Sequence, residues 1–268
     1  MPELPEIANL ARQLNERLPG KKISRIDVIQ PKCLNMPEEE FRAALVGAQI
    51  GSAAHRGKWI QVHTDRGWLL INLGMGGELL LVSRETLPEK RRLVFEFDDS
   101  SVLSVNFWWF GYAHFTPEDG LASHPMLGKL GPNALDLDAQ AFAALAVGQR
   151  GRVKDFLLDQ SKLAGIGNAY VHDILWMARL HPLRKISSLS TEEIGALHRA
   201  IGDGLRPSLE KGGAFYEMDT YGQKGGFTFD EIQVGYKDGK PCPVCGTPIE
   251  KIKTGGTSSF ICPSCQKI

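Results

Sequence analysis

Hydrophobic residues near the start of the chain repeat with the period of an α-helix. Apolar side chains occur every three or four residues over positions 5–18, so one face of a helix there would pack on a core. Pro5 is tolerated in the first turn of such a helix, and Gly20 lies just past its end. The pattern predicts an amphipathic helix from about Pro5 to Leu18.

From about residue 23 to residue 115 the apolar positions form short, β-rich runs. The clearest predicted strands span residues 59–63, 68–71 and 93–97. Turn sequences rich in Gly, Asp and Ser separate the strands, at residues 65–67, 74–77 and 98–101. Many short strands with such turns predict an antiparallel β-sandwich.

The second half of the chain has a helical pattern over residues 138–210. Ser190, with Glu193 three residues later, is a capping-box signal for a helix that reaches about Leu209. The glycine-rich residues 211–226 predict a loop. We therefore expect an α+β, multidomain protein with a β-sandwich domain at 1–116, a linker at 117–130, a helical domain with the loop at 131–236, and a short module at 237–268.

Composition favours a globular protein of the cytoplasm. The chain has 268 residues, of which 43% are hydrophobic and 23% charged. No apolar run approaches the length of a membrane span, and the first residues do not resemble a signal peptide. The net charge is zero, whereas DNA-binding chains usually carry a positive excess. Local clusters such as Lys90-Arg91-Arg92 predict a basic face on a neutral molecule.

Four of the five cysteines form two CxxC pairs near the C-terminus. Two such pairs on a β-hairpin can present four thiolates tetrahedrally to zinc, and four thiolates leave no open position for catalysis. The sequence thus predicts a structural Zn²⁺ bound by Cys242, Cys245, Cys262 and Cys265. Cys33 stands apart and is interpreted as a lone thiol.

The N-terminus carries a second chemical signal. Removal of Met1 would expose the secondary amine of Pro2, with the carboxylate of Glu3 beside it. A secondary amine attacks carbonyl-type carbons and forms a charged iminium, which can drive bond cleavage in a sugar. The two ends together suggest an enzyme that acts on nucleic acid.

Other motifs are weaker when taken alone. The glycine-rich turn at 165–168 offers amide groups to a phosphate, but a plain helix–helix turn explains it equally well. Lys58 and Met75 carry little information in isolation. The aromatic run 107–110 cannot lie on one face of a strand, so part of it is expected to be exposed, either for stacking on bases or as a bridge between core and cleft.

Together these motifs resemble the family of formamidopyrimidine-DNA glycosylase and endonuclease VIII, nearly end to end. The resemblance covers the start at 2–6, the Arg56-Gly-Lys58 motif, the Met75 loop at 73–76, Leu130-Gly-Pro132, the helix–two-turn–helix segment at 157–170, and the cysteine module through Gln266. It implies a β-sandwich with an N-terminal helix, a helix–two-turn–helix domain and a zinc-finger hairpin.

The resemblance also implies a function. It implies a bifunctional glycosylase and AP lyase of base-excision repair, a monomer in the bacterial cytosol or nucleoid that binds duplex DNA with damaged bases or abasic sites. Pro2 would be the nucleophile, Glu3 the acid/base, and Lys58 a phosphate contact in the catalytic centre. Further substrate or DNA contacts would be Glu6, Arg56, Met75, Trp108, Trp109, Phe110, Asn168, Tyr170, Asp173, Tyr216, Tyr221 and Thr257, with Met218 and Asp219 also in the loop that reads the flipped base.

Three positions depart from the family pattern. Trp108 stands where many members carry an arginine that bonds the orphaned base, Thr257 replaces an arginine in the zinc-finger hairpin, and Asp173 replaces a glutamate expected to face the catalytic domain. Losing a charged phosphate contact costs on the order of 1.5–3 kcal/mol. These departures favour the alternative of a DNA-binding relative with weak or no catalysis. Neutral charge and exposed aromatic residues leave a third class open, an RNA- or ribosome-associated zinc-ribbon protein.

Overall fold

The computed structural model describes residues 1–108 and 110–268, and the chain divides into two compact units. One unit comprises residues 1–129 and 211–226, and the other comprises residues 130–210 and 227–268. The first boundary falls at the end of the expected linker. The loop 211–226, however, groups with the N-terminal unit, whereas the sequence pattern places it in the helical domain.

The N-terminal unit consists of a helix and two antiparallel sheets. Helix α1 (Leu4–Arg17) matches the predicted helix to within one residue at each end. One sheet has the strand order β1-β6-β7-β5, and the other has the order β2-β3-β4-β8. The strands are β1 (Ile23–Val28), β2 (Ile50–Arg56), β3 (Trp59–Thr64), β4 (Gly67–Asn72), β5 (Glu78–Val82), β6 (Leu93–Phe97), β7 (Val102–Asn106) and β8 (Tyr112–Thr116).

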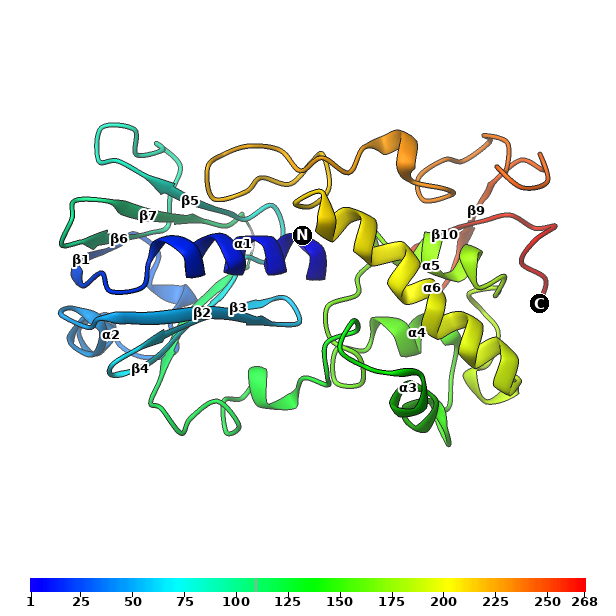
Figure 1. The fold of residues 1–268 in the computed structure, drawn as a ribbon, viewed down its shortest axis with the longest axis horizontal. Coiled ribbons are helices and arrows are strands. Elements are labelled where there is room, and N and C mark those ends of the chain that lie inside the picture. The colour runs from blue at the N-terminus through cyan, green and yellow to red at the C-terminus, as the bar shows by residue number, and fades with distance from the viewer. Residues whose placement is uncertain (109) are drawn as a thin grey trace. The chain divides into compact units, whose positions relative to one another are not determined.

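The core of this unit joins α1 to both sheets. Figure 1 shows α1 running lengthwise beside the strands, and its apolar stripe is fully buried, with Leu14 and Leu18 both at 0% exposure. Helix α2 (Glu38–Leu45) adds Phe41 to the same cluster, which extends to Phe95 and Val105 of the sheet β1-β6-β7-β5. The predicted β-sandwich is therefore confirmed, and its closed core fixes the N-terminal end of α1.

The C-terminal unit is helical and ends in a hairpin. Its helices are α3 (Ala139–Ala146), α4 (Val153–Leu158), α5 (Val171–Met177) and α6 (Thr191–Glu210). The capping box predicted for α6 is formed, because the Ser190 amide donates to Glu193 (2.9 Å) and the Glu193 amide donates to the Ser190 hydroxyl (3.3 Å). The hairpin pairs β9 (Glu250–Lys253) with β10 (Ser258–Ile261).

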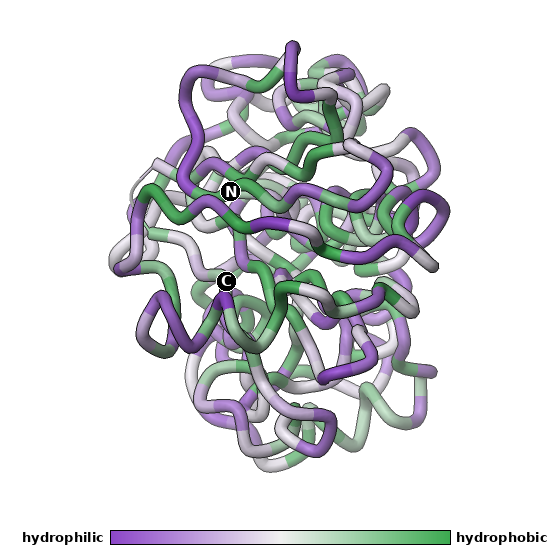
Figure 2. Tube along the Cα trace, turned by 90° about the vertical axis from the view of Figure 1, so that its left-hand side faces the viewer, coloured by the Kyte–Doolittle hydropathy of each residue, from purple (hydrophilic) through white to green (hydrophobic). Residues whose placement is uncertain are grey.

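Short 3-10 helices complete the fold: η1 (Pro31–Cys33), η2 (Leu127–Lys129), η3 (Ile186–Ser188) and η4 (Phe229–Glu231). Many of the outermost loops of the trace are hydrophilic (Figure 2). Within the described ranges, no helix is both long and apolar enough to cross a membrane.

Candidate active site and zinc centre

The N-terminal end of α1 gathers buried carboxylates around Pro2. Glu3 and Glu6 are each 4% exposed, and the backbone amide of Glu3 donates to Oε2 of Glu6 (2.9 Å). This capping-box pairing fixes the first turn of the helix. Pro2 is buried immediately before that turn, so the fold positions it beside two acids.

Lys58 brings a cation to the same end of the unit. It lies in the turn between β2 and β3, where its carbonyl accepts a hydrogen bond from the Asn72 side chain (3.1 Å). Burial lowers the pKa of the Lys58 ammonium, and the charges of Glu3 and Glu6 act in the opposite direction. The site therefore contains a partly desolvated cation that interacts electrostatically with both acids.

Glu6 also holds the loop 211–226. Its Oε1 accepts the backbone amide of Ala214 (3.0 Å), and a Cβ added to Gly213 would lie 3.0 Å from its side chain. Glu6 is among the substrate or DNA contacts that the family resemblance implies. In the structure both of its carboxylate oxygens accept backbone amides, so Glu6 positions the loop against α1, and a contact with substrate stays a prediction.

Glu217 reaches the N-terminus from that loop. Its Oε1 lies 3.3 Å from the amine of Met1, and its side chain is 12% exposed. Burial raises the pKa of the Glu217 carboxyl, the terminal amine opposes this, and Glu6 and Glu78 raise it further. Glu217 is missing from the residues expected from the sequence, because one glutamate in a glycine-rich loop gives no sign of a partner more than two hundred residues away.

The rest of the loop runs back along α1. Gln13 accepts from the backbone amide of Thr220 (2.9 Å) and donates to Asp219 (3.0 Å), and Arg17 donates to the Tyr221 hydroxyl (3.0 Å). These contacts lie toward the far end of a helix that is about 21 Å long.

Two of the expected base contacts hold the loop to this helix. Asp219 and Tyr221 bond Gln13 and Arg17 in the distal half of α1, and their contact with a flipped base stays a prediction. Tyr216 and Met218 flank Glu217, and both are exposed. Of the expected loop contacts, these two remain near the N-terminus.

Three exposed apolar side chains form what we call the wedge cluster, consisting of Met75, Trp108 and Phe110. Their exposed fractions are 51%, 66% and 47%, while neighbouring Phe107 is buried. The two loops that carry them pack together, because a Cβ on Gly76 would lie 3.4 Å from the Trp108 indole and Gly74 lies against the Phe110 carbonyl. The expectation that part of the aromatic run is exposed is confirmed. Trp109 lies outside the described residues.

In the C-terminal unit, Asn168 lies in the turn before α5. Its Oδ1 is buried and has no hydrogen-bond partner among the described residues. An unpaired amide group at a half-buried position is costly unless a ligand or water engages it. Gly165, with φ of +107°, shapes this turn. The geometry leaves Asn168 available for a ligand contact.

Two other residues expected to contact DNA are buried and hydrogen-bonded within this unit, and their contact with DNA stays a prediction. Tyr170 is 5% exposed, and its hydroxyl bonds that of Ser208 (2.6 Å), so it ties α5 to α6. Asp173 is 7% exposed, and it accepts the backbone amides of Gln233 (2.7 Å), Val234 (2.9 Å) and Gly235 (2.9 Å). Its carboxylate is fully used in fixing the chain after η4, so it is an anchor within its own unit.

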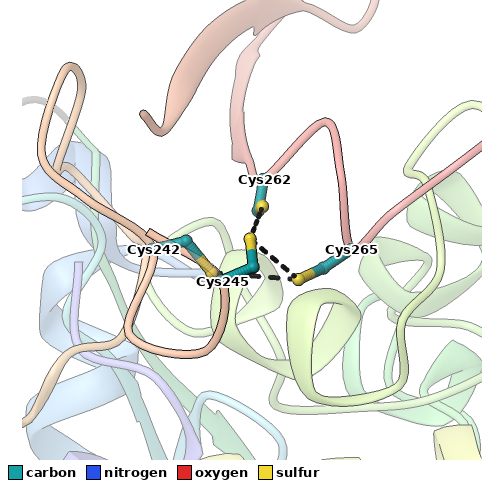
Figure 3. Close-up of side chains that lie close together, drawn as sticks. All are labelled: Cys242, Cys245, Cys262 and Cys265. Atoms are coloured by element: carbon teal, nitrogen blue, oxygen red, sulfur yellow. Dashed lines mark hydrogen bonds between the residues drawn. The ribbon is translucent and has the colours of Figure 1, made fainter. Parts of the chain in front are cut away.

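The four cysteines of the two CxxC pairs converge in one cluster. Figure 3 shows their sulfurs facing one another from the two knuckles, and all four lie within 4.8 Å of one another. Sulfur–sulfur distances include 3.4 Å for Cys245–Cys262 and 3.9 Å for Cys242–Cys265. Tetrahedral zinc with Zn–S bonds near 2.3 Å requires about 3.8 Å between sulfurs, so the cluster fits a structural Zn²⁺.

The zinc cluster is fixed to the helices of its unit. Val234 and Trp176 pack against Cys242, and buried Gln266 accepts from the Cys262 amide (2.9 Å) while donating to the Leu180 carbonyl (2.9 Å). The metal therefore fixes the base of the hairpin β9–β10, whose tip carries Thr257.

Family models match the chain over three segments. The N-terminal domain of formamidopyrimidine-DNA glycosylase matches residues 1–107, its H2TH domain matches 130–219, and a zinc finger found in FPG and IleRS matches 239–268. A protein named formamidopyrimidine-DNA glycosylase from Pelotomaculum thermopropionicum is 35% identical, and the match covers 100% of this chain and 100% of the relative. A protein of the same name from Chloroflexus aurantiacus is also 35% identical, and the match covers 99% of this chain and 98% of the relative.

The chain belongs to the formamidopyrimidine-DNA glycosylase family. Solved structures of Lactococcus lactis Fpg agree: a complex with Fapy-dG-containing DNA has a TM-score of 0.91 at 30% identity, covering 100% of both chains. A complex with abasic-site DNA has a TM-score of 0.91 and covers 99% of this chain. The bifunctional glycosylase and AP-lyase activity is that of the family, so the chain is an enzyme of DNA repair with a structural zinc finger.

Lys154 is a second residue, after Glu217, that the sequence does not identify as part of a functional site. It is 1% exposed, and its ammonium lies under the tip of the zinc-finger hairpin. The sequence gives no sign of its burial, because Asp155 follows it directly and a lysine beside an aspartate is usually solvated.

Proposed function

We propose that this protein excises damaged bases from duplex DNA and nicks the strand at the resulting abasic site, with the amine of Pro2 as nucleophile. The observation that carries the proposal is the arrangement at the start of α1, where Pro2 is buried beside Glu3 and Glu6. The charges of both glutamates also act on the Lys58 ammonium and raise its pKa against the effect of burial. The relatives solved with Fapy-dG and abasic-site DNA support DNA with a damaged or missing base as the substrate. The proposed place of action is the bacterial cytosol or nucleoid.

The chemistry requires that Met1 be removed, because in the full chain the Pro2 nitrogen belongs to a peptide bond. The free secondary amine attacks C1′, the bond from C1′ to the base breaks, and the base leaves with a proton. Opening of the sugar ring then breaks the C1′–O4′ bond, O4′ takes up a proton, and C1′ becomes part of an iminium. The iminium acidifies C2′, so loss of a C2′ proton expels the 3′ phosphate by β-elimination. A second elimination expels the 5′ phosphate, and water then releases the sugar fragment from the enzyme.

Glu3 is the proposed acid/base in these steps. Its carboxylate is next to the nucleophile in sequence and is held in the first turn of α1 by the capping box. It would assist opening of the sugar ring and move the proton at O4′. Lys58 would hold a backbone phosphate next to the reacting sugar, which keeps C1′ within reach of the amine.

The wedge cluster would occupy the space left by the flipped nucleotide. Extrusion of a base costs a few kcal/mol of stacking, and exposed apolar side chains recover part of it by filling the gap. Trp108 can stack on bases but cannot reproduce the paired hydrogen bonds of an arginine. We therefore expect weak discrimination of the opposite base, because the indole offers a single N–H donor.

Borohydride trapping tests the proposal. The protein, confirmed by mass to lack Met1, is mixed with an abasic duplex and sodium borohydride, which reduces the iminium to a stable amine. We expect a covalent adduct and, without borohydride, a strand nick. Pro2→Gly keeps a primary amine and should trap less, while Glu3→Gln should bind the duplex and lose at least about 100-fold in rate.

The result that would overturn the enzyme is duplex binding without any adduct or nick in the processed protein. That outcome would establish the alternative, a damage-binding relative without catalysis. Stronger binding to single-stranded RNA than to the abasic duplex would instead favour the third class of protein.

A further inference from the structure

The tip of the zinc-finger hairpin contains a buried cation. The Lys154 ammonium is enclosed by four oxygen acceptors: the hydroxyls of Thr254 (3.2 Å), Thr257 (3.1 Å) and Ser259 (2.9 Å), and the carbonyl of Ser258 (2.7 Å). All four acceptors are neutral. An ammonium has three N–H donors, so it is fully hydrogen-bonded, yet its charge is desolvated without a bonded carboxylate among the described residues.

The Thr257 hydroxyl is oriented by this cation. Thr257 is exposed at the end of the Gly-Gly turn, and its Oγ1 accepts from Lys154. Because the oxygen accepts from the ammonium below, its own O–H must point elsewhere, and the exposed side of the turn is available. The hydroxyl is therefore prepared to donate outward to an acceptor that the positive charge beneath it would also attract.

An exposed guanidinium lies beside the same turn. Arg152 precedes α4, and its Nη1 would lie 3.5 Å from a Cβ built on Gly255, whose φ is +85°. A Cβ at residue 255 would be in ordinary van der Waals contact with this guanidinium, so the arginine head group lies directly beside the turn. No ion pair of Arg152 with a carboxylate is found among the described residues. The backbone of Arg152 forms an isolated antiparallel β-bridge with that of Lys185, whose side chain is another exposed cation.

We propose that Arg152 and the Thr257 hydroxyl form a site for one phosphodiester of the DNA backbone, with Lys154 beneath them. The inference rests on the proposed DNA substrate and adds a contact that the hairpin itself does not provide, since Thr257 carries no charge. A guanidinium matches two phosphate oxygens with paired N–H donors, and the hydroxyl supplies a third donor. The positive charge at the hairpin tip would thus come from Arg152, at the start of α4, and not from the hairpin itself.

The test measures binding to a duplex with a tetrahydrofuran abasic analogue, which the enzyme cannot cleave, over a range of salt concentrations. The zinc-loaded, full-length protein is compared with Arg152→Ala, Arg152→Lys and the control Arg150→Ala, which removes an exposed arginine two residues away. We expect Arg152→Ala to weaken binding about tenfold and to lower the log–log salt slope by about one. Arg152→Lys should keep the slope and lose part of the affinity.

The control should change affinity less than about twofold, because surface charges away from a phosphate contact contribute little. An Arg152→Ala protein with the salt slope of the unaltered enzyme, or with the small loss seen for Arg150→Ala, would overturn the site. Failure of the DNA substrate looks different, since the unaltered protein would then show no salt-dependent binding to the duplex, and failure of the catalytic proposal alone would leave this binding intact while trapping gives no adduct.

Discussion

The two units of the molecule each hold a functional loop with a buried charge, but of opposite sign and in different surroundings. In the N-terminal unit the anion Glu6 binds the loop 211–226 through the Ala214 amide, and the cation Lys58 lies within electrostatic reach. In the C-terminal unit Lys154 binds the hairpin tip through four neutral oxygens. Glu6 is bonded to two backbone amides near the Lys58 cation, whereas Lys154 is bonded, among the described residues, to neutral oxygens only and interacts with one carboxylate, that of Asp155, through space.

The difference indicates which of the two buried charges would be stabilised further by a bound ligand. A buried charge close to an opposite charge is satisfied in the free protein, and it rigidifies what it holds. A buried cation without a bonded carboxylate is destabilising by itself and becomes favourable when an anion arrives. The first arrangement suits a preorganised catalytic centre, and the second suits a surface that binds phosphate.

Of the changes considered, zinc removal should have the largest effect, and it should affect only the C-terminal unit. Without metal the four thiolates lose their bond partners, and the hairpin loses most of its folding free energy, because metal binding in such modules is worth about 10 kcal/mol or more. Chelation followed by hydrogen-exchange mass spectrometry should show deprotection of residues 237–268 and no change in the two sheets. Loss of protection in the β-sandwich at the same time would contradict independent units.

Neutralising the two buried charges should have unequal effects. Glu6→Gln places an NH₂ group against one of two backbone amides, Glu3 or Ala214, which leaves donor facing donor and costs about 1–3 kcal/mol. Lys154→Met keeps the volume and removes the desolvated charge, so its stability should change by less than about 1.5 kcal/mol. Urea unfolding with zinc present measures both, and a larger loss for Lys154→Met would reverse the argument.

Acid should weaken the N-terminal unit through a pair of buried histidines. His124 accepts the Leu127 amide, so its other nitrogen donates to His114 (2.9 Å), and this pair holds residues 117–129 against β8. Burial, and then the charge of His124, lowers the pKa of His114 to about 4.

The sign follows from proton uptake. An unfolded histidine titrates near pH 6.5, so between about pH 6.5 and 4 the unfolded chain binds more protons and stability falls as pH falls. In His114→Gln this part of the acid loss should disappear. Thermal midpoints at pH 7 and pH 4.5 give the difference for each protein, and an equal drop in both would exclude His114 as a source.

Elements with a strong local signal were predicted well. The period of α1, the strands at 59–63 and 93–97, and the capping box of α6 all follow from residues within a few positions of one another, and the structure confirms them. The zinc ligands belong to the same group, because the CxxC spacing places two thiolates on one knuckle whatever the remainder of the chain does.

The partners of side chains that bond distant segments could not be predicted from local sequence. Tyr170 and Asp173 carry groups typical of DNA contacts, yet they are buried against Ser208 and the backbone at 233–235. Local sequence cannot distinguish a polar side chain that waits for a ligand from one satisfied by a segment about forty or sixty residues away. Lys154 shows the opposite error, since a lysine is usually solvated and gave no sign of burial.

The sequence by itself determined the family, the four-cysteine zinc module, the order of the elements and the amine–carboxylate pair at the N-terminus, because these depend on residue type and short spacing. Only the tertiary structure decided that the loop 211–226 belongs with α1, that Glu6 positions this loop, and that the hairpin tip rests on a buried cation. Those features arise from hydrogen bonds between segments 100 residues or more apart, whose pairing is fixed by the packing of complete units rather than by any local pattern.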